Sequence, residues 1–335
     1  MDEKMYPVAD IRQLVIQALV HHNSSRINAE AVADALIAAE MDGLRGHGLS
    51  RLVSYCGQAA SGKVDGNAEP VATRVRGAAV RVDAGNGFAY PAMELAVSEL
   101  TALAPEMGVA VAAITNSHHC GAAGYHVEKL AREGLVGLLF ANTPKAIAPW
   151  GGSQALFGTN PIAFGVPGKD REPMVIDLAL SKVARGKIMV ASKENRDIPE
   201  GWALDSEGNP TTDSARALGG TMLPMGDAKG AALVLMVEIL AAAVTGSNFG
   251  YEASSFFEAD GKPPNVGQLL MAIFPGPLSG EAFYSRIEAL FAEILGQDNT
   301  RLPGERRLGL RDEARQQGLK LNPAEYNQLR QLAAA

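Results

Sequence analysis

Two adjacent histidines, His118 and His119, stand where an apolar stretch passes into a helical pattern. The upstream stretch, residues 109–114, predicts a buried strand, and residues 124–132 place apolar side chains at helical spacing. The glycine-containing loop between them would leave backbone N–H groups free at a helix N-terminus, which favours an anionic ligand. Histidine is the side chain whose ordinary pKa allows proton exchange near neutral pH. The segment therefore predicts proton transfer beside an anion site.

A second candidate site surrounds His47, which lies between Gly46 and Gly48. Glycines on both sides let the backbone approach a ligand closely. Arg51 follows four residues later, at the predicted start of a helix, and its planar guanidinium suits a carboxylate. By itself this segment is equally consistent with a turn between two helices that carries a surface arginine.

A turn that enters a strand carries Thr159 and Asn160, whose side chains can donate to a ligand. Alone, this segment is best explained as a plain turn. Lys229 begins the longest apolar helix between Gly226 and Gly230, where its charge and the helix dipole would both favour an anion.

Two further segments are rich in basic residues. Lys182, Arg185 and Lys187 lie within a few positions of one another and form a local anion patch. Arg301, Arg306 and Arg307 surround a turn, which is either a solvated basic loop or a clamp for a phosphate.

Several common site types are not indicated. The glycines at 85 and 87 follow a strand, but Tyr90 occupies the third position of the dinucleotide-binding fingerprint, so a tight turn is the better interpretation. Adjacent histidines point in different directions, and His118 and His119 have no Cys, His, Asp or Glu partners at metal-ligand spacing. We therefore expect a role in a site for this pair, with metal binding or a purely structural role as the alternatives.

Composition limits the class of protein. The 335 residues carry a net charge of -7 without any basic block, so we expect neither nucleic acid nor a membrane as partner. Cys56 and Cys120 form no paired motif, as expected for free thiols in a reducing compartment. Residues 231–244 are apolar but short and contain Glu238, so they predict a buried helix. A cytoplasmic location is expected.

The elements that must position these residues follow from hydrophobic periodicity. Helices are predicted over residues 8–21, 28–41, 50–60, 91–103, from 229 onward, 280–295 and 312–332. Strands are predicted over 80–83, 109–114, 136–141, 162–166, 174–176 and 266–274, and residues 189–226 are expected to be mostly loops. This pattern indicates an α/β protein whose helical termini pack together.

Taken in order along the chain, these segments resemble the type-2 malate/L-lactate dehydrogenase family of NAD(P)-dependent oxidoreductases. The resemblance runs from about Val8 to Arg307 and rests on the segments around His47, His119, Thr159 and Lys229. It implies a non-Rossmann NAD(P)-binding domain with a largely antiparallel sheet over residues 76–279. A helical substrate and dimerisation domain would combine residues 1–75 and 280–335, usually in a homodimer.

The resemblance also implies roles for single residues. His47 would exchange the proton, although His119 has that role in some members, so the assignment between the two stays open. Arg51 would hold the substrate carboxylate, with Thr159, Arg185, Gly186 and Lys187 lining the substrate pocket. The cofactor would contact His119, Cys120, Gly121, Ala122, Ala123, Asp177, Leu178, Ala179, Lys229, Arg301, Gly304, Arg306 and Arg307.

The family contains several activities. Many members have a serine where this chain has Gly46, and the cyclic-imine reductases have an aspartate where this chain has Lys187. We therefore expect hydride transfer at C2 of a small 2-oxo or 2-hydroxy acid of the malate, lactate or 3-sulfolactate type. The alternatives are reduction of Δ1-piperideine-2-carboxylate or Δ1-pyrroline-2-carboxylate, and a catalytically silent nucleotide-binding protein. The arginines at 301–307 favour NADPH over NADH, because a 2′-phosphate binds arginine.

Overall fold

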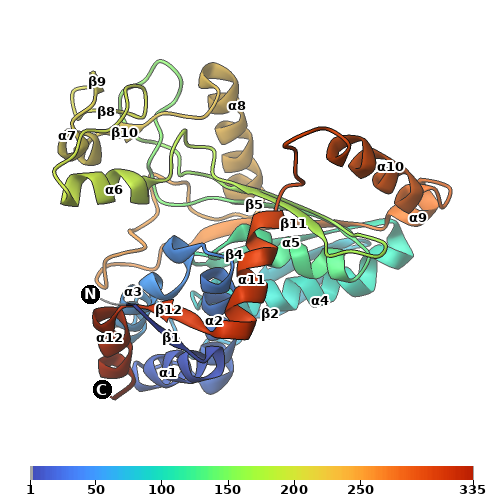
Figure 1. Ribbon diagram of the computed structural model, residues 1–335, viewed down its shortest axis with the longest axis horizontal. Helices are drawn as coiled ribbons and strands as arrows, with labels where there is room; N and C mark the ends of the chain where they lie inside the picture. The colour runs from blue at the N-terminus through green and yellow to red at the C-terminus, as the bar shows by residue number, and fades with distance from the viewer. Residues whose placement is uncertain (1–2, 335) are drawn as a thin grey trace.

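A seven-stranded sheet lies at the centre of the computed structural model, which describes residues 3–334 (Figure 1). The strand order is β2-β3-β4-β11-β5-β6-β7. Their bounds are β2 Val71–Arg76, β3 Ala79–Asp83, β4 Val109–Ser117, β5 Val136–Ala141, β6 Ile162–Val166, β7 Met174–Leu178 and β11 Val266–Ile273. All neighbours are antiparallel except β3 and β4, which are parallel. The predicted α/β fold with a largely antiparallel sheet is confirmed.

One face of the sheet packs against helices α4 (Ala89–Met107) and α5 (Ala123–Arg132). Alternate residues of β4 point to this face, and Ala110, Ala112 and Ile114 are buried there. The small alanines let α4 approach the sheet closely. This layer places the N-terminus of α5 directly after the loop that carries the paired histidines.

The other face is covered by a lobe in which the sequence predicted only the helix from residue 229 onward. It contains α6 (Arg185–Lys193), α7 (Ser214–Gly219), α8 (Asp227–Glu238), the π-helical turn η3 (Ile239–Ala243) and a small sheet of β8 (Ala203–Leu204), β9 (Pro210–Thr211) and β10 (Thr221–Met222). The stretch of residues 189–226, predicted to be rich in loops, thus also contains the end of α6, α7 and the small sheet. These elements are too short to show a hydrophobic period, and they are held by a shared core that includes Ile188, Ala217, Met222 and Val234.

The two ends of the chain form one helical unit, as predicted (Figure 1). Helices α1 (Val8–His21), α2 (Arg26–Met41) and α3 (Leu52–Ser61) share a core with α11 (Glu305–Gln317) and α12 (Pro323–Ala334). Strand β1 (Lys4–Tyr6) pairs antiparallel with β12 (Leu319–Leu321). Two short 3-10 helices, η1 (Arg45–His47) and η2 (Leu49–Arg51), connect α2 to α3.

The single helix predicted over residues 312–332 is divided in the structure. Gly318 has φ +94 and ends α11, and a Cβ at this position would lie 2.3 Å from the Tyr6 carbonyl oxygen of β1. Asn322 then caps α12, because its side-chain oxygen accepts hydrogen bonds from the backbone N–H groups of Ala324 and Glu325, both at 2.9 Å.

Helices α9 (Pro275–Leu278) and α10 (Phe283–Leu295) lie away from the paired termini (Figure 1). Among the buried residues of the helical unit, those from the C-terminal end belong to α11, β12 and α12, and none belongs to α10. The predicted grouping of residues 280–335 with the N-terminal helices therefore needs a later boundary. The two-domain division itself stays a prediction. Among residues 3–334, no helix has both the length and the apolar character needed to cross a bilayer.

Candidate active site

The imidazole rings of His47 and His119 stack on each other, with centroids 5.4 Å apart and an interplanar angle of 20°. His47 comes from η1 in the helical unit, whereas His119 comes from the loop between β4 and α5. His47 is half-buried, and its Nδ1 is buried without a partner. The structure thus brings together the two histidines that the sequence singled out.

Tyr55 of α3 fixes the orientation of His119. Its hydroxyl lies 2.6 Å from His119 Nδ1 and 3.1 Å from the hydroxyl of Tyr90. Burial raises the pKa of Tyr55 to about 12, so the hydroxyl keeps its proton at neutral pH. Because Nδ1 is occupied, Nε2 is the ring atom of His119 left for a ligand. Tyr55 is not among the residues predicted from the sequence, although its place one helical turn after Arg51 puts the two residues on one face of α3.

Arg51 lies at the start of α3 with a restrained side chain. Its Nε donates to the Gly46 carbonyl oxygen at 2.6 Å, and its guanidinium carbon lies 4.6 Å from the centre of the Phe257 ring. Among residues 3–334, its two terminal nitrogens make no hydrogen bond or ion pair. They form a planar fork that suits a carboxylate or another oxyanion.

The three histidines around this cation are neutral in the unliganded protein. Burial lowers the pKa of His47 to about 4, and the positive charge of Arg51 adds to this effect. Burial, together with Arg51, holds the pKa of His119 well below its ordinary value. Burial also lowers the pKa of His118 to about 3, with Lys63 and Arg51 adding to the effect. One guanidinium therefore opposes protonation of the whole cluster.

His118 has a different environment from His119. Both of its ring nitrogens are buried without a hydrogen-bond partner, and its ring packs against Phe88, Tyr55 and Phe256. Of the two adjacent imidazoles, His118 thus belongs to the packing, and His119 alone stacks on His47.

A second group of predicted residues meets at the N-terminus of α5. The carboxylate of Asp177 accepts a hydrogen bond from the Gly124 N–H at 2.7 Å. Gly304 lies beside the same strand, where a Cβ would be 3.2 Å from the Val175 carbonyl oxygen. The expectation of free N–H groups awaiting an anion is wrong for Gly124, because a carboxylate of this chain already occupies it. Asp177 instead presents an acceptor, which suits a hydroxyl group better than a phosphate.

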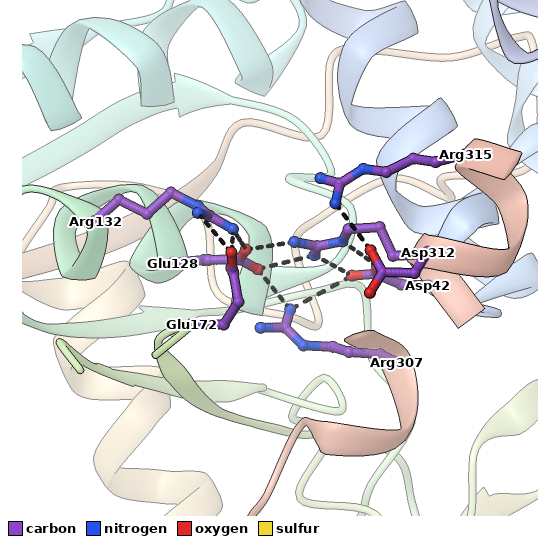
Figure 2. A network of polar contacts seen from close by, with 8 residues as sticks. Asp42, Glu128, Arg132, Glu172, Arg307, Asp312 and Arg315 are labelled. Carbon is purple, nitrogen blue, oxygen red and sulfur yellow. Dashed lines mark hydrogen bonds and ion pairs between the residues drawn. The ribbon is translucent and has the colours of Figure 1, made fainter. Parts of the chain in front are cut away.

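Arg307 takes part in a buried network of ion pairs (Figure 2). Its Nη1 lies 2.8 Å from Glu128 Oε2 and 3.4 Å from Asp42 Oδ2, and Arg311 bridges the same two carboxylates at 2.6 and 2.7 Å. The network ties α11 to α2 and α5. The Nε and Nη2 atoms of Arg307 remain buried without a partner, so this side chain can still bind a group at the same place. Arg301 and Arg306 are exposed.

The remaining predicted residues lie in the lobe or, for Thr159, in the turn before β6. The backbone N–H of Thr159 donates to Thr143 Oγ1 at 2.9 Å. Arg185 Nη2 lies 3.4 Å from the Leu218 carbonyl oxygen. Gly186, Lys187 and Lys229 are exposed. Within residues 3–334, no hydrogen bond joins any of these side chains to His47 or His119.

The turn that carries Thr159 is held by a buried carboxylate. Glu238, which is 2% exposed, accepts hydrogen bonds from Asn160 Nδ2 at 2.7 Å and from the Gly250 N–H at 2.6 Å. Asn160 has φ +41, a conformation that needs such support. These hydrogen bonds show that Glu238, the charged residue within the apolar stretch 231–244, fixes this turn.

Comparison with known proteins agrees with this geometry. The model of the malate/L-lactate dehydrogenase family matches residues 6–330. The chain belongs to this family. The predicted family is therefore confirmed, and with it an enzyme of the dehydrogenase and reductase class.

Similar members of the malate/L-lactate dehydrogenase family have more than one activity. A (2R)-3-sulfolactate dehydrogenase (NADP(+)) from Chromohalobacter salexigens is 51% identical over 332 residues, 99% of each chain. A Δ1-pyrroline-2-carboxylate/Δ1-piperideine-2-carboxylate reductase from Pseudomonas syringae pv. tomato is 42% identical and covers 96% of this chain and 94% of its own.

Solved structures of the malate/L-lactate dehydrogenase fold superpose closely. The crystal structure of Δ1-piperideine-2-carboxylate reductase from P. syringae has a TM-score of 0.93 at 40% identity and covers 98% of this chain and 99% of its own. Sulfolactate dehydrogenase from Methanocaldococcus jannaschii has a TM-score of 0.90 at 29% identity, with coverage of 98% and 96%.

Proposed function

We propose that this protein is an NADP(H)-dependent oxidoreductase that interconverts a small 2-oxo acid and the corresponding 2-hydroxy acid, with 3-sulfolactate as the leading substrate type. The observation that carries the proposal is the free fork of Arg51 beside the stacked imidazoles of His47 and His119. The name of the C. salexigens relative supports both the substrate type and NADP(+).

The residues divide the chemistry between them. Arg51 binds the substrate carboxylate through its two terminal nitrogens and so fixes the position of C2. His47 donates a proton to the oxygen on C2 during reduction and removes it during oxidation. His119, oriented by Tyr55, offers its Nε2 to the same oxygen and stabilises developing negative charge. NADP(H), when bound, supplies or accepts the hydride at C2.

Carboxylate binding also prepares the proton donor. The charge of Arg51 is one cause of the low pKa of His47 in the unliganded protein. A substrate carboxylate on Arg51 neutralises this charge, so the pKa of His47 rises when the substrate is in place. Protonation of His47 is therefore opposed less strongly in the complex than in the unliganded protein.

The second group of residues fits a dinucleotide. Arg307 keeps two buried nitrogen atoms without partners, and Asp177 presents an acceptor at the start of α5. We infer that these residues and the neighbouring Gly121–Ala123 segment hold the cofactor. We infer that Arg301 and Arg306, exposed at the same turn, bind the 2′-phosphate, because arginine is a favourable partner for a phosphate. The contact of Lys229 with the cofactor stays a prediction, as do the homodimer and the cytoplasmic location.

A cyclic-imine reductase is the second candidate. The similarity to the P. syringae reductase favours it, and the same Arg51 fork would bind the ring carboxylate of Δ1-pyrroline-2-carboxylate. Against it, the family resemblance implies an aspartate in cyclic-imine reductases at the position where this chain has Lys187. A cation in this place suits a substrate with a second acidic group.

A substrate panel tests the proposal. Purified protein is mixed with NADPH or NADH and with sulfopyruvate, oxaloacetate, pyruvate or the two cyclic imines, and the loss of reduced cofactor is followed by absorbance. We expect the highest kcat/KM with sulfopyruvate and NADPH. Preferential turnover of a cyclic imine would instead establish the second candidate. Tight NADPH binding without turnover of any of these acids would contradict both and indicate a silent binding protein.

A further inference from the structure

Residues 255–259, here called the strap, lie between η3 and β11 and are fastened to α3. Gln58 Nε2 donates to the Phe256 and Glu258 carbonyl oxygens at 2.9 and 3.0 Å. Lys63 Nζ donates to the Ser255 and Glu258 carbonyl oxygens at 2.7 and 2.9 Å. Gln58 and Lys63 are 0% and 2% exposed. These hydrogen bonds from two buried side chains hold the backbone of the strap in one position, because breaking them would leave buried polar groups without partners.

The strap presents two phenylalanine rings to the candidate active site. Phe256 is buried, and its ring centre lies 5.1 Å from that of His118 and 5.2 Å from that of His119. Phe257 is 54% exposed, so burial does not account for its position. Within residues 3–334, the one specific contact of its ring is with the guanidinium of Arg51, at 4.6 Å.

Helix α3 therefore holds both partners of this contact. Arg51 begins the helix, and the buried side chain of Gln58 fastens the strap that carries Phe257. The guanidinium is restrained on one edge by the Gly46 carbonyl oxygen and on one face by the Phe257 ring. The edge that remains is the pair of terminal nitrogens. A long side chain without these restraints would sample many rotamers and lose the orientation needed for bidentate binding.

We propose that Phe257 is a positioning residue for Arg51, so that the strap sets the affinity for the carboxylate of the substrate. The inference rests on the proposed function, because it assigns the Arg51 fork to that carboxylate. Phe257 acts through Arg51 and does not touch the reacting atoms. Its removal should therefore raise the substrate KM, while kcat at saturating substrate and the KM for NADPH change little.

The test compares three variants with the parent protein in steady-state assays with sulfopyruvate and NADPH. Phe257→Leu keeps an apolar side chain but removes the aromatic face, whereas Phe257→Trp keeps that face. Tyr251→Leu is the matched control, because Tyr251 is also half-exposed, is near in sequence and, among the residues that the structure describes, stacks only on Phe249. We expect Phe257→Leu to raise the substrate KM about 2- to 30-fold, the range of a cation–π contact, and Phe257→Trp and Tyr251→Leu to stay within about twofold of the parent.

The outcomes separate the two proposals. A parent protein that reduces neither a 2-oxo acid nor a cyclic imine overturns the proposed function. A parent that turns over sulfopyruvate, together with a folded Phe257→Leu variant whose substrate KM is unchanged, overturns only the positioning role. Equal rises in substrate KM for Phe257→Leu and Phe257→Trp also overturn it, because the aromatic face would then not matter. Thermal unfolding of each variant establishes that it is folded.

Discussion

His47 and His119 lie ring on ring at 5.4 Å, although one belongs to the helical unit and the other to the end of a central strand. The pair is therefore formed only when the two parts of the molecule come together. Its other neighbours, Tyr55 and Arg51, come from α3 or its N-terminus. A proton-exchanging site is thus built across the junction between the helical unit and the sheet.

Replacement of His47 by alanine should lower kcat by a factor of about 10² to 10⁴, because a general acid or base contributes this much. The measurement is the rate of NADPH oxidation at saturating sulfopyruvate. His21→Ala is the control, since His21 is exposed at the end of α1. Unchanged turnover in His47→Ala would assign proton exchange to His119 instead.

Replacement of Tyr55 by phenylalanine should lower kcat, because His119 loses the hydroxyl that bonds its Nδ1 and orients its ring. The variant should also lose about 1–3 kcal/mol of folding free energy, since Nδ1 is left buried without a partner. Urea unfolding and kcat are measured together. Tyr90→Phe removes the hydroxyl that contacts Tyr55 but not His119, so it should have the smaller effect on kcat. A larger effect of Tyr90→Phe than of Tyr55→Phe would show that Tyr55 does not orient His119.

The pH dependence of reduction should reflect the low pKa of His47. Burial and Arg51 place this pKa at about 4 in the unliganded protein, and kcat/KM reports ionisations of the free enzyme. We expect kcat/KM for 2-oxo acid reduction to keep rising as the pH falls from about 8 to about 5, and kcat/KM for 2-hydroxy acid oxidation to stay level over that range. A reduction profile that levels off near the ordinary imidazole pKa of about 6.5 would contradict the assignment.

The same pKa has a consequence for stability. The unfolded chain takes up a proton at this histidine below its ordinary pKa of about 6.5, whereas the folded protein does so only near the lowered value. His47 therefore makes its whole contribution to the free energy of unfolding above the ordinary pKa of about 6.5. That contribution decreases below this pH and is lost as the pH falls through the lowered pKa of about 4.

Replacement of Arg311 by methionine should destabilise the protein by about 3 kcal/mol, because it leaves Asp42 and Glu128 with fewer partners in a buried network. Arg315→Met is the matched control on the same helix (Figure 2), since Arg315 and Asp312 are mostly exposed and their pair should contribute about 0–1 kcal/mol. Urea unfolding at neutral pH measures both. Equal effects of the two substitutions would show that the network does not hold α11.

The network also predicts an acid dependence. Although burial alone would raise it, hydrogen bonds and charges from Arg311, Arg307 and Arg132 bring the pKa of Glu128 down to about 2, from an ordinary value of 4.5. Its contribution to stability is present above the ordinary value and is lost as the pH falls towards the lowered one. The parent protein should therefore lose stability across this interval, and Arg311→Met should show a shallower loss.

Local patterns in the sequence predicted much of the fold. The bounds of α1, β5 and β6 agree with their predicted ranges, because each has a clear hydrophobic period or apolar run of its own. The segments around His47 and His119 were likewise identified from residue types and spacing. The short elements between residues 194 and 226 were not, because their stability depends on a shared core rather than on their own pattern.

The sequence by itself determined which residues have the chemistry for proton exchange and carboxylate binding, since side-chain type and local spacing suffice for that. Only the tertiary structure decided which side chains contact them. His118 is buried without a hydrogen-bond partner, whereas the Tyr55 hydroxyl contacts His119 Nδ1. The Phe257 ring lies against the Arg51 guanidinium, and Arg307 pairs with a buried carboxylate, that of Glu128. These contacts join residues far apart along the chain, so no local pattern encodes them, and they form only when the helical unit, the strap and the sheet pack against one another.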